Sequence, residues 1–312
     1  MESIENIGII GSGLIGRSWA MIFASAGYKV TIYDIEEKLV NSALEEIKTQ
    51  LLKLESDKTL RGKLSAAEQI QLIDGCNHLK TIVQKSSFLQ ECIPERINLK
   101  KDLYKQIDQV IGDKTIISTS TSTFLPSLLS EDLTHRNNFI VSHPVNPPYF
   151  VPLVEIVPAP WTESWVAEAT RDLMQKVGQA PIVLKKEVPG FALNRVQYAI
   201  LNECFNLIED GLVSVEDIDK VMTEGLGMRY AFLGPLETAH LNAEGFKNYT
   251  ERYAESMYAV SKTFKPIPKI TGPVAENIDQ QLVKLTPVDK LPARRIWRDE
   301  SLVKLSQLKR NN

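Results

Sequence analysis

Short runs of apolar residues alternate with longer amphipathic stretches from Ile4 to about Lys186. The apolar runs are rich in isoleucine and valine and are mostly continuous, which is typical of strands that are covered on both faces. We therefore expect a doubly wound α/β domain, in which crossover helices join the strands of a largely parallel sheet. The expected strands are 7–10, 29–33, 88–93, 115–119, 139–143, 153–157 and 182–185.

Two other stretches have helical patterns. Residues 36–74 are highly charged, with an apolar stripe at helical spacing formed by Leu39, Ala43, Ile47, Leu51 and Leu54. This stretch reads as an amphipathic helical excursion, and we assign it no chemistry. At Pro189-Gly190 the strand patterns stop, and a helix is expected from near Pro189 to Asp210, with Gly211 after its end. We therefore expect an α/β domain over residues 1–187 and an all-helical C-terminal domain over residues 188–312.

The composition narrows the possible functions. The chain has 312 residues, enough for two domains, and its 36 basic against 39 acidic residues leave a net charge of −3. This balance argues against a nucleic-acid partner. The sequence has no run of about 18 consecutive apolar residues, so we expect no membrane span. Cys76, Cys92 and Cys204 stand far apart, so neither a disulfide framework nor a metal site is expected. With no address signal at either end, the expected location is the cytoplasm.

A glycine motif follows the first expected strand. Gly11, Gly13 and Gly16 form a G-x-G-x-x-G pattern that opens a helix, and Asp34 ends the next strand. Gly11 would allow a tight turn, Gly13 the approach of a pyrophosphate, and Gly16 close packing of helix on strand. Asp34 would accept hydrogen bonds from ribose hydroxyls and repel a 2′-phosphate, which favours NAD over NADP. The context predicts a Rossmann-type NAD-binding domain; the alternative is a glycine turn without a ligand.

One histidine stands where an open α/β sheet binds its ligands. His143 ends an expected strand, and ligands bind beyond the carboxyl ends of strands in such sheets. Glu155 lies within the next apolar run, where an unpaired carboxylate is costly, so His143 is its natural partner. Such a carboxylate would orient the imidazole as a general base. The alternatives are a structural histidine and a Glu155 paired with an arginine.

Two further polar features have open interpretations. Residues 118–123 form an alternating Ser/Thr run at the end of another expected strand. The run is either a turn that satisfies local backbone groups or a set of donors near the nicotinamide. Asn194, near the start of the long helix, could reach the same cleft.

Together these features resemble the 3-hydroxyacyl-CoA dehydrogenase superfamily and, within it, the lambda-crystallin branch of L-gulonate 3-dehydrogenases. The likeness covers essentially the whole chain. The segments that carry it are Gly11–Gly16, Glu91–Arg96, Ser118–Thr123, His143–Tyr149, Pro189–Arg195, Gly225–Phe232, Gly234–Thr238, His240–Gly245 and Ala293–Glu300.

The resemblance implies a role for individual residues. His143 would be the general base and Glu155 its partner. Ser122 and Asn194 would hydrogen-bond the reacting oxygen and so bind substrate. The implied NAD contacts are the backbone at Leu14 and Ile15, the side chain of Asp34, and Glu95 and Lys100 near the cofactor. The run reads Ser120-Thr121-Ser122-Thr123 where hydroxyacyl-CoA enzymes usually carry Asn-Thr-Ser-Ser, which leaves the register of Ser122 open.

The resemblance also implies the reaction and the assembly. The substrate would be a small hydroxy acid, L-gulonate, oxidised at the hydroxyl beta to its carboxylate in uronate metabolism, and the chain would form a homodimer through the helical domain. Arg229 is our candidate for binding the substrate carboxylate, with a packing or ion-pair role as the alternative. Two other functions stay open: a short-chain 3-hydroxyacyl-CoA dehydrogenase and a structural role of the lens-crystallin kind.

Overall fold

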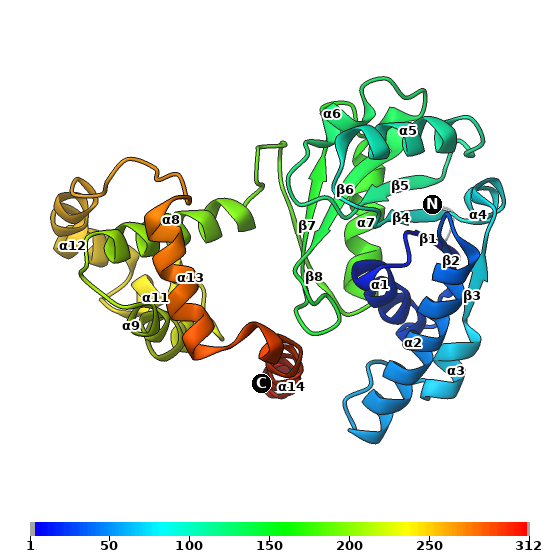
Figure 1. Ribbon diagram of the computed structural model, residues 1–312. Helices are drawn as coiled ribbons and strands as arrows, with labels where there is room; N and C mark the ends of the chain where they lie inside the picture. Colours follow the sequence, from blue (N-terminus) through cyan, green and yellow to red (C-terminus); the bar gives the residue numbers. More distant parts are fainter. Residues whose placement is uncertain (1–3, 311–312) are drawn as a thin grey trace. The chain divides into compact units, whose positions relative to one another are not determined.

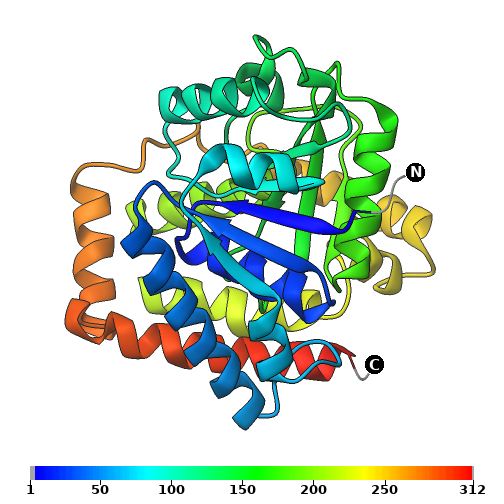
Figure 2. The ribbon, with the colours of Figure 1, turned by 90° about the vertical axis from the view of Figure 1, so that its right-hand side faces the viewer.

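The computed structural model describes residues 4–310 of the chain. One eight-stranded sheet organises its first part, with the strands in the order β3-β2-β1-β4-β5-β6-β7-β8. The strands are β1 (Asn6–Ile10), β2 (Lys29–Tyr33), β3 (Ile73–Cys76), β4 (Phe88–Glu91), β5 (Ile116–Thr119), β6 (Phe139–Pro144), β7 (Leu153–Pro158) and β8 (Ala180–Val183). All neighbouring strands are parallel except β6 and β7, which are antiparallel. The blue and cyan strands β1, β2 and β3 lie side by side in Figure 2.

The helices that accompany the sheet occupy most of the connections between its strands (Figure 1). They are α1 (Leu14–Ser25), α2 (Glu37–Ser56), α3 (Ala66–Gln71), α4 (Leu79–Lys85), α5 (Ile97–Asp108), α6 (Pro126–Ser130), the 3-10 turn η1 (Arg136–Asn138) and α7 (Ser164–Lys176). The rest of the chain is helical. Its elements are α8 (Leu193–Glu209), α9 (Val215–Lys220), the π-helical turn η2 (Val221–Leu226), α10 (Gly227–Tyr230), α11 (Pro235–Leu241), α12 (Phe246–Ser261), α13 (Pro273–Leu285), η3 (Val288–Lys290) and α14 (Leu291–Arg310).

The two faces of the sheet are covered by different helices. Side chains of α1, α2 and α7 form one core cluster with alternate residues of the strands, such as Ile9 of β1 and Ile140 of β6. Side chains of α4, α5 and α6 form a second cluster with the intervening strand residues, such as Ile10 and Phe139. Because both faces are buried, consecutive strand residues are apolar, and this explains the continuous runs in the sequence.

The described residues divide into two compact units. The first contains residues 4–195 and 302–307, and the second contains residues 196–301 and 308–310. A small apolar cluster centred on Ile208, Val215 and Ile218 lies within the second unit. The α/β sheet and the helical C-terminal region expected from the sequence are confirmed.

Some elements differ from the expectation. Residues 36–74 are not wholly helical, because α2 and α3 are followed by the edge strand β3, which begins at Ile73 and pairs in parallel with β2. Only one of its four residues is buried, so it lacks the apolar run of a central strand. The last strand, β8, begins two residues earlier than expected, at Ala180, and α8 begins at Leu193 rather than near Pro189. Among the described residues, no helix is both long and apolar enough to span a bilayer.

Candidate active site

The turn between β1 and α1 has the geometry of a phosphate-binding loop. Gly11 has a φ of +105°, a conformation that side chains other than glycine rarely adopt. A Cβ atom at Gly16 would lie 1.9 Å from the Gly11 carbonyl oxygen, so only glycine permits this contact between helix and turn. At Gly13 a Cβ atom would meet no heavy atom within 4 Å, which leaves its backbone open to a ligand.

The first turn of α1 fits an anion. Its N-cap is Gly13, which has no side chain to cap the free N–H groups, and it carries no acidic residue. Leu14 is exposed and Ile15 is half-buried at this end of the helix. Unpaired N–H groups and the positive end of the helix dipole favour a phosphate here.

Asp34 lies beside the same turn. Its Oδ2 atom accepts hydrogen bonds from the Ser12 backbone N–H (2.8 Å) and the Ser12 hydroxyl (2.6 Å), and its Oδ1 atom accepts one from the Ile35 N–H (2.8 Å). These three donors hold the carboxylate at the carboxyl end of β2 while leaving it half-buried. A carboxylate oxygen can accept more than one hydrogen bond, so Asp34 keeps capacity for ribose hydroxyls.

His143 and Glu155 form a buried pair. They are directly opposite each other on the antiparallel strands β6 and β7, and the His143 Nδ1 atom lies 2.8 Å from Glu155 Oε2. The His143 side chain is 7% exposed and the Glu155 side chain is fully buried. A carboxylate on Nδ1 favours the tautomer that has its proton there and leaves Nε2 as the acceptor.

The second Glu155 oxygen binds the start of α8. The Oε1 atom accepts hydrogen bonds from the backbone N–H groups of Ala192 (2.8 Å) and Leu193 (2.9 Å). Burial raises the pKa of the Glu155 carboxyl, but the hydrogen bonds from His143, Leu193 and Ala192 outweigh burial, so the pKa lies below its ordinary value. The carboxylate therefore stays ionised beside the imidazole at neutral pH.

Phe191 directs the chain toward this carboxylate. It has a φ of 51°, in the left-handed region, and its ring lies 5.6 Å from the His143 ring, centroid to centroid. Its side chain is fully buried against Val141 and Val157. This packing stabilises a backbone conformation that phenylalanine rarely adopts and that turns the next two N–H groups toward Glu155.

Ser122 and Asn194 are also brought together. The Asn194 side-chain amide donates a hydrogen bond of 2.8 Å to the Ser122 carbonyl oxygen. Asn194 directly follows Leu193, which binds Glu155. The expected base, its partner and the two residues expected to bind the reacting oxygen therefore belong to one connected group in the first unit.

Glu95 and Lys100 are connected to the Ser/Thr run. The Glu95 Oε1 atom accepts hydrogen bonds from the hydroxyls of Thr121 and Thr123 and from the Ser122 backbone N–H. Lys100 Nζ lies 3.3 Å from Glu95 Oε2, and the Lys100 side chain is only 1% exposed. Glu95 therefore stands at the surface, whereas Lys100 is buried behind it.

Arg229 lies in a different part of the chain. It is an exposed residue of the short helix α10, within the second unit. The glycine-interrupted segment around it was expected to be a loop or a helix end, and it is a π-helical turn followed by four helical residues.

Comparison with known proteins supplies the family. Residues 6–188 match the model of the 3-hydroxyacyl-CoA dehydrogenase NAD binding domain, and residues 190–269 match that of the 3-hydroxyacyl-CoA dehydrogenase C-terminal domain. The chain belongs to the 3-hydroxyacyl-CoA dehydrogenase family. Members of this family are NAD-dependent dehydrogenases that act on hydroxyl groups, so the NAD expected from the glycine motif is confirmed as the cofactor.

Individual relatives agree with this family. The chain is 50% identical over 303 residues to the lambda-crystallin homolog of Rattus norvegicus, covering 96% of this chain and 95% of the rat protein. It is 49% identical over 304 residues to the lambda-crystallin of Oryctolagus cuniculus, covering 97% and 95% of the two chains. The crystal structure of 5-formyl-3-hydroxy-2-methylpyridine 4-carboxylic acid 5-dehydrogenase has the same fold, with a TM-score of 0.85, 24% identity and 99% of each chain covered.

Two contributors to the site were not foreseen from the sequence. Phe191 falls within the helix expected from near Pro189, whereas in the structure it precedes α8 and has a left-handed backbone conformation. Glu91 lies in a segment that carries the family resemblance, but the resemblance implies no role for it. It is nevertheless a carboxylate within an expected buried strand, as Glu155 is within another. The cost of burying a charge was a signal that could have singled it out.

Proposed function

We propose that this family member oxidises L-gulonate to 3-dehydro-L-gulonate, with NAD as the hydride acceptor. The observation that carries the chemistry is the buried pair of His143 and Glu155 at the carboxyl end of β6. The choice of substrate rests on identity near 50% with lambda-crystallins over 96% of the chain.

In this proposal His143 is the general base. Its Nε2 atom, opposite the nitrogen that faces Glu155, takes the proton of the substrate hydroxyl. Glu155 stabilises the imidazolium that forms, and its lowered pKa keeps it charged for that role. Bound NAD would accept the hydride from the substrate carbon that carries this hydroxyl.

The remaining residues bind and orient. The Ser122 hydroxyl and the Asn194 amide hydrogen-bond the oxygen on which negative charge grows, and the hydrogen bond from that amide to the Ser122 backbone carbonyl keeps the two residues close together. Arg229 binds the substrate carboxylate. The turn at Gly11, Gly13 and Gly16 and the N–H groups of Leu14 and Ile15 hold the pyrophosphate.

The ribose contacts complete the cofactor site. Asp34 binds the hydroxyls of a ribose of NAD, and Glu95 lies near the cofactor. Lys100 acts from behind Glu95 rather than from an exposed position.

We further propose that two chains associate through the second unit. None of the sixteen residues of α12 and none of the thirteen residues of α13, all of them described, is buried. Helices are stabilised mainly by burying an apolar face, and α12 exposes Tyr253, Met257 and Tyr258. A second copy of the chain would cover such a face.

The proposed location is the cytoplasm. Cys76, Cys92 and Cys204 are free thiols, which suits a reducing compartment. Fractionation of cells that express the chain tests this assignment, and recovery of the protein from an oxidising compartment would contradict it.

One assay separates the candidate substrates. NADH formation is followed with L-gulonate, and NADH consumption is followed with acetoacetyl-CoA. We expect the kcat/KM for L-gulonate to be higher than that for acetoacetyl-CoA. Turnover of the CoA ester alone would replace the substrate proposal, and turnover of neither would favour a structural role.

A further inference from the structure

A second buried carboxylate lies at the end of β4. Glu91 is fully buried in the centre of the sheet, between β1 and β5. A carboxylate in such a position costs several kcal/mol unless it is paired and fully hydrogen-bonded. The mechanism outlined above does not use this residue.

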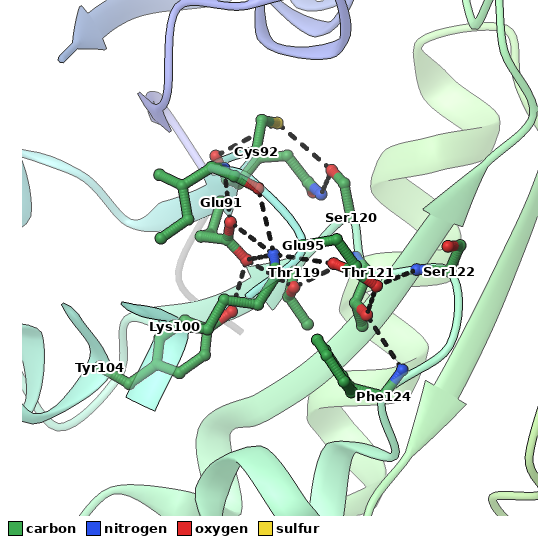
Figure 3. A network of polar contacts seen from close by, with 12 residues as sticks. Glu91, Cys92, Glu95, Lys100, Tyr104, Thr119, Ser120, Thr121, Ser122 and Phe124 are labelled. Atoms are coloured by element: carbon green, nitrogen blue, oxygen red, sulfur yellow. Dashed lines mark hydrogen bonds and ion pairs between the residues drawn. The ribbon is translucent and has the colours of Figure 1, made fainter. Parts of the chain in front are cut away.

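Five hydrogen bonds converge on this one carboxylate (Figure 3). The Oε1 atom accepts from the Ile93 backbone N–H (2.6 Å) and from Lys100 Nζ (2.8 Å). The Oε2 atom accepts from Lys100 Nζ (2.9 Å), the Tyr104 hydroxyl (2.5 Å) and the Thr119 hydroxyl (2.6 Å). Burial, together with the nearby Glu91 charge, raises the pKa of Tyr104 well above its ordinary value, so its hydroxyl remains a donor.

These donors come from the loop after β4, from helix α5 and from the end of β5, and the first and last of them adjoin the loops that carry Glu95 and Ser122. Ile93 lies in the loop after β4 that carries Glu95, and Thr119 ends β5 just before the loop that carries Ser122. Backbone contacts join the loops to the same point, because the Ser120 N–H donates to the Glu91 carbonyl (2.9 Å). The Thr121 N–H donates to the Thr119 hydroxyl (3.2 Å).

The charges continue outward from Glu91. Lys100 Nζ bridges the buried Glu91 and the exposed Glu95, and Glu95 in turn accepts from Thr121, Ser122 and Thr123. A buried ion pair alone contributes little net stability, because desolvation offsets the attraction. The arrangement is therefore better explained by what it holds in place than by the stability it adds.

We propose that Glu91 is a positioning residue for NAD binding: through Lys100, Thr119 and the Ile93 N–H, it fixes the two loops that present Glu95 and Ser122. This inference rests on the proposed function, because that proposal places the cofactor near Glu95 and the reacting oxygen near Ser122. Glu91 is not assigned a contact with either and acts through Glu95 and Ser122.

The test compares Glu91→Gln with the unaltered chain by calorimetric titration of NAD in the absence of any hydroxy acid. Glutamine has nearly the same shape as glutamate, but its amide nitrogen cannot accept hydrogen bonds. The groups that donate to one of the two Glu91 oxygens therefore lose their acceptor. We expect the Kd for NAD to rise about tenfold, with a parallel rise in the KM for NAD and a smaller change in kcat. Lys101→Met is the matched control, because Lys101 lies on the same helix in a more exposed ion pair with Glu131, and it should bind NAD normally.

Two further variants separate positioning from stability. Thr119→Val removes one hydroxyl while leaving the Glu91–Lys100 pair in place, and it should weaken NAD binding severalfold even if Glu91→Gln fails to fold. The double variant Glu91→Gln/Lys100→Met removes both buried charges. We expect it to recover thermal stability relative to Glu91→Gln without recovering NAD affinity.

Different results would contradict the inference about Glu91 and the proposed substrate. NAD binding within twofold of the unaltered chain by Glu91→Gln or Thr119→Val would overturn the inference. Recovery of stability and NAD affinity together in the double variant would do the same, since it would indicate a purely structural ion pair. Failure to oxidise L-gulonate would overturn only the proposed substrate, because the titration contains none.

Discussion

At the scale of single residues, the site depends on carboxylates that use both oxygens. Glu155 orients His143 with one oxygen and binds the N–H groups at the start of α8 with the other. Asp34 likewise divides its oxygens between Ser12 and Ile35. Each carboxylate is thereby held in one orientation, which reduces the reorganisation needed when a ligand binds.

Replacing His143 with glutamine tests the base. Glutamine retains a polar side chain but cannot take the hydroxyl proton, so we expect oxidation to fall by about 100-fold or more, with the Kd for NAD nearly unchanged. Stopped-flow measurement of NADH formation gives the rate, and calorimetry gives the Kd. A His143→Gln enzyme with near-normal kcat would show that another group is the base.

The lowered pKa of Glu155 predicts how the stability of the folded chain depends on pH. Its pKa in the folded chain lies below the ordinary value of 4.5, so the stability it contributes is fully present above that value and is lost as the pH falls through the folded-state pKa. The free energy of unfolding of the unaltered chain should exceed that of Glu155→Gln near neutral pH, and the difference should narrow below pH 4.5.

Urea denaturation of both proteins at a series of pH values measures this difference. Glu131→Gln is the control, because Glu131 is an exposed carboxylate whose removal should have a much smaller effect at neutral pH. A difference between the unaltered chain and Glu155→Gln that stays constant down to about pH 3 would contradict the assignment.

At the scale of elements, the β1–α1 turn separates two roles of glycine. Gly16 is required for packing, because a Cβ atom there would collide with the Gly11 carbonyl, whereas Gly13 has open space in front of it. The same motif therefore contains one position selected by the fold and one left free for a ligand.

Alanine at each position should give opposite results. We expect Gly16→Ala to lower the free energy of unfolding by about 1–3 kcal/mol through overpacking. Gly13→Ala should change it by no more than about 1 kcal/mol, the cost of a poorer helix cap, while raising the Kd for NAD markedly. Chemical denaturation and NAD titration of the two variants measure both effects. Equal losses of stability would refute this division.

At the scale of the whole molecule, the two units differ in how completely they bury apolar residues. Among the residues that the structure describes, the first has large clusters on both faces of its sheet, whereas the second has one small cluster and many exposed apolar side chains. A helical unit with so little core of its own gains most from association with another surface.

The expected assembly is therefore a homodimer. Sedimentation equilibrium at micromolar concentration should give the mass of two chains, and dilution should lower thermal stability as the dimer dissociates. A stable monomer over the same concentration range would contradict the proposed association through the second unit.

The predictions from the sequence succeeded where the physical constraint is local. Continuous apolar runs identified most strands because burial on both faces favours apolar residues at consecutive positions, and the glycine spacing identified the turn because left-handed backbone favours glycine. The edge strand β3 was missed because it is mostly exposed and follows a strongly helical stretch.

By itself, the sequence determined the α/β class, the NAD fingerprint and a histidine at a strand end, since each follows from residues close together in the chain. Only the tertiary structure decided which partners meet. The register of β6 on β7 sets His143 opposite Glu155, and the turn at Phe191 brings the start of α8 to that carboxylate. The convergence of Lys100, Tyr104 and Thr119 on Glu91 depends in the same way on the packing of α5 and β5 around β4, because hydrogen bonds between distant residues are created by packing rather than by sequence spacing.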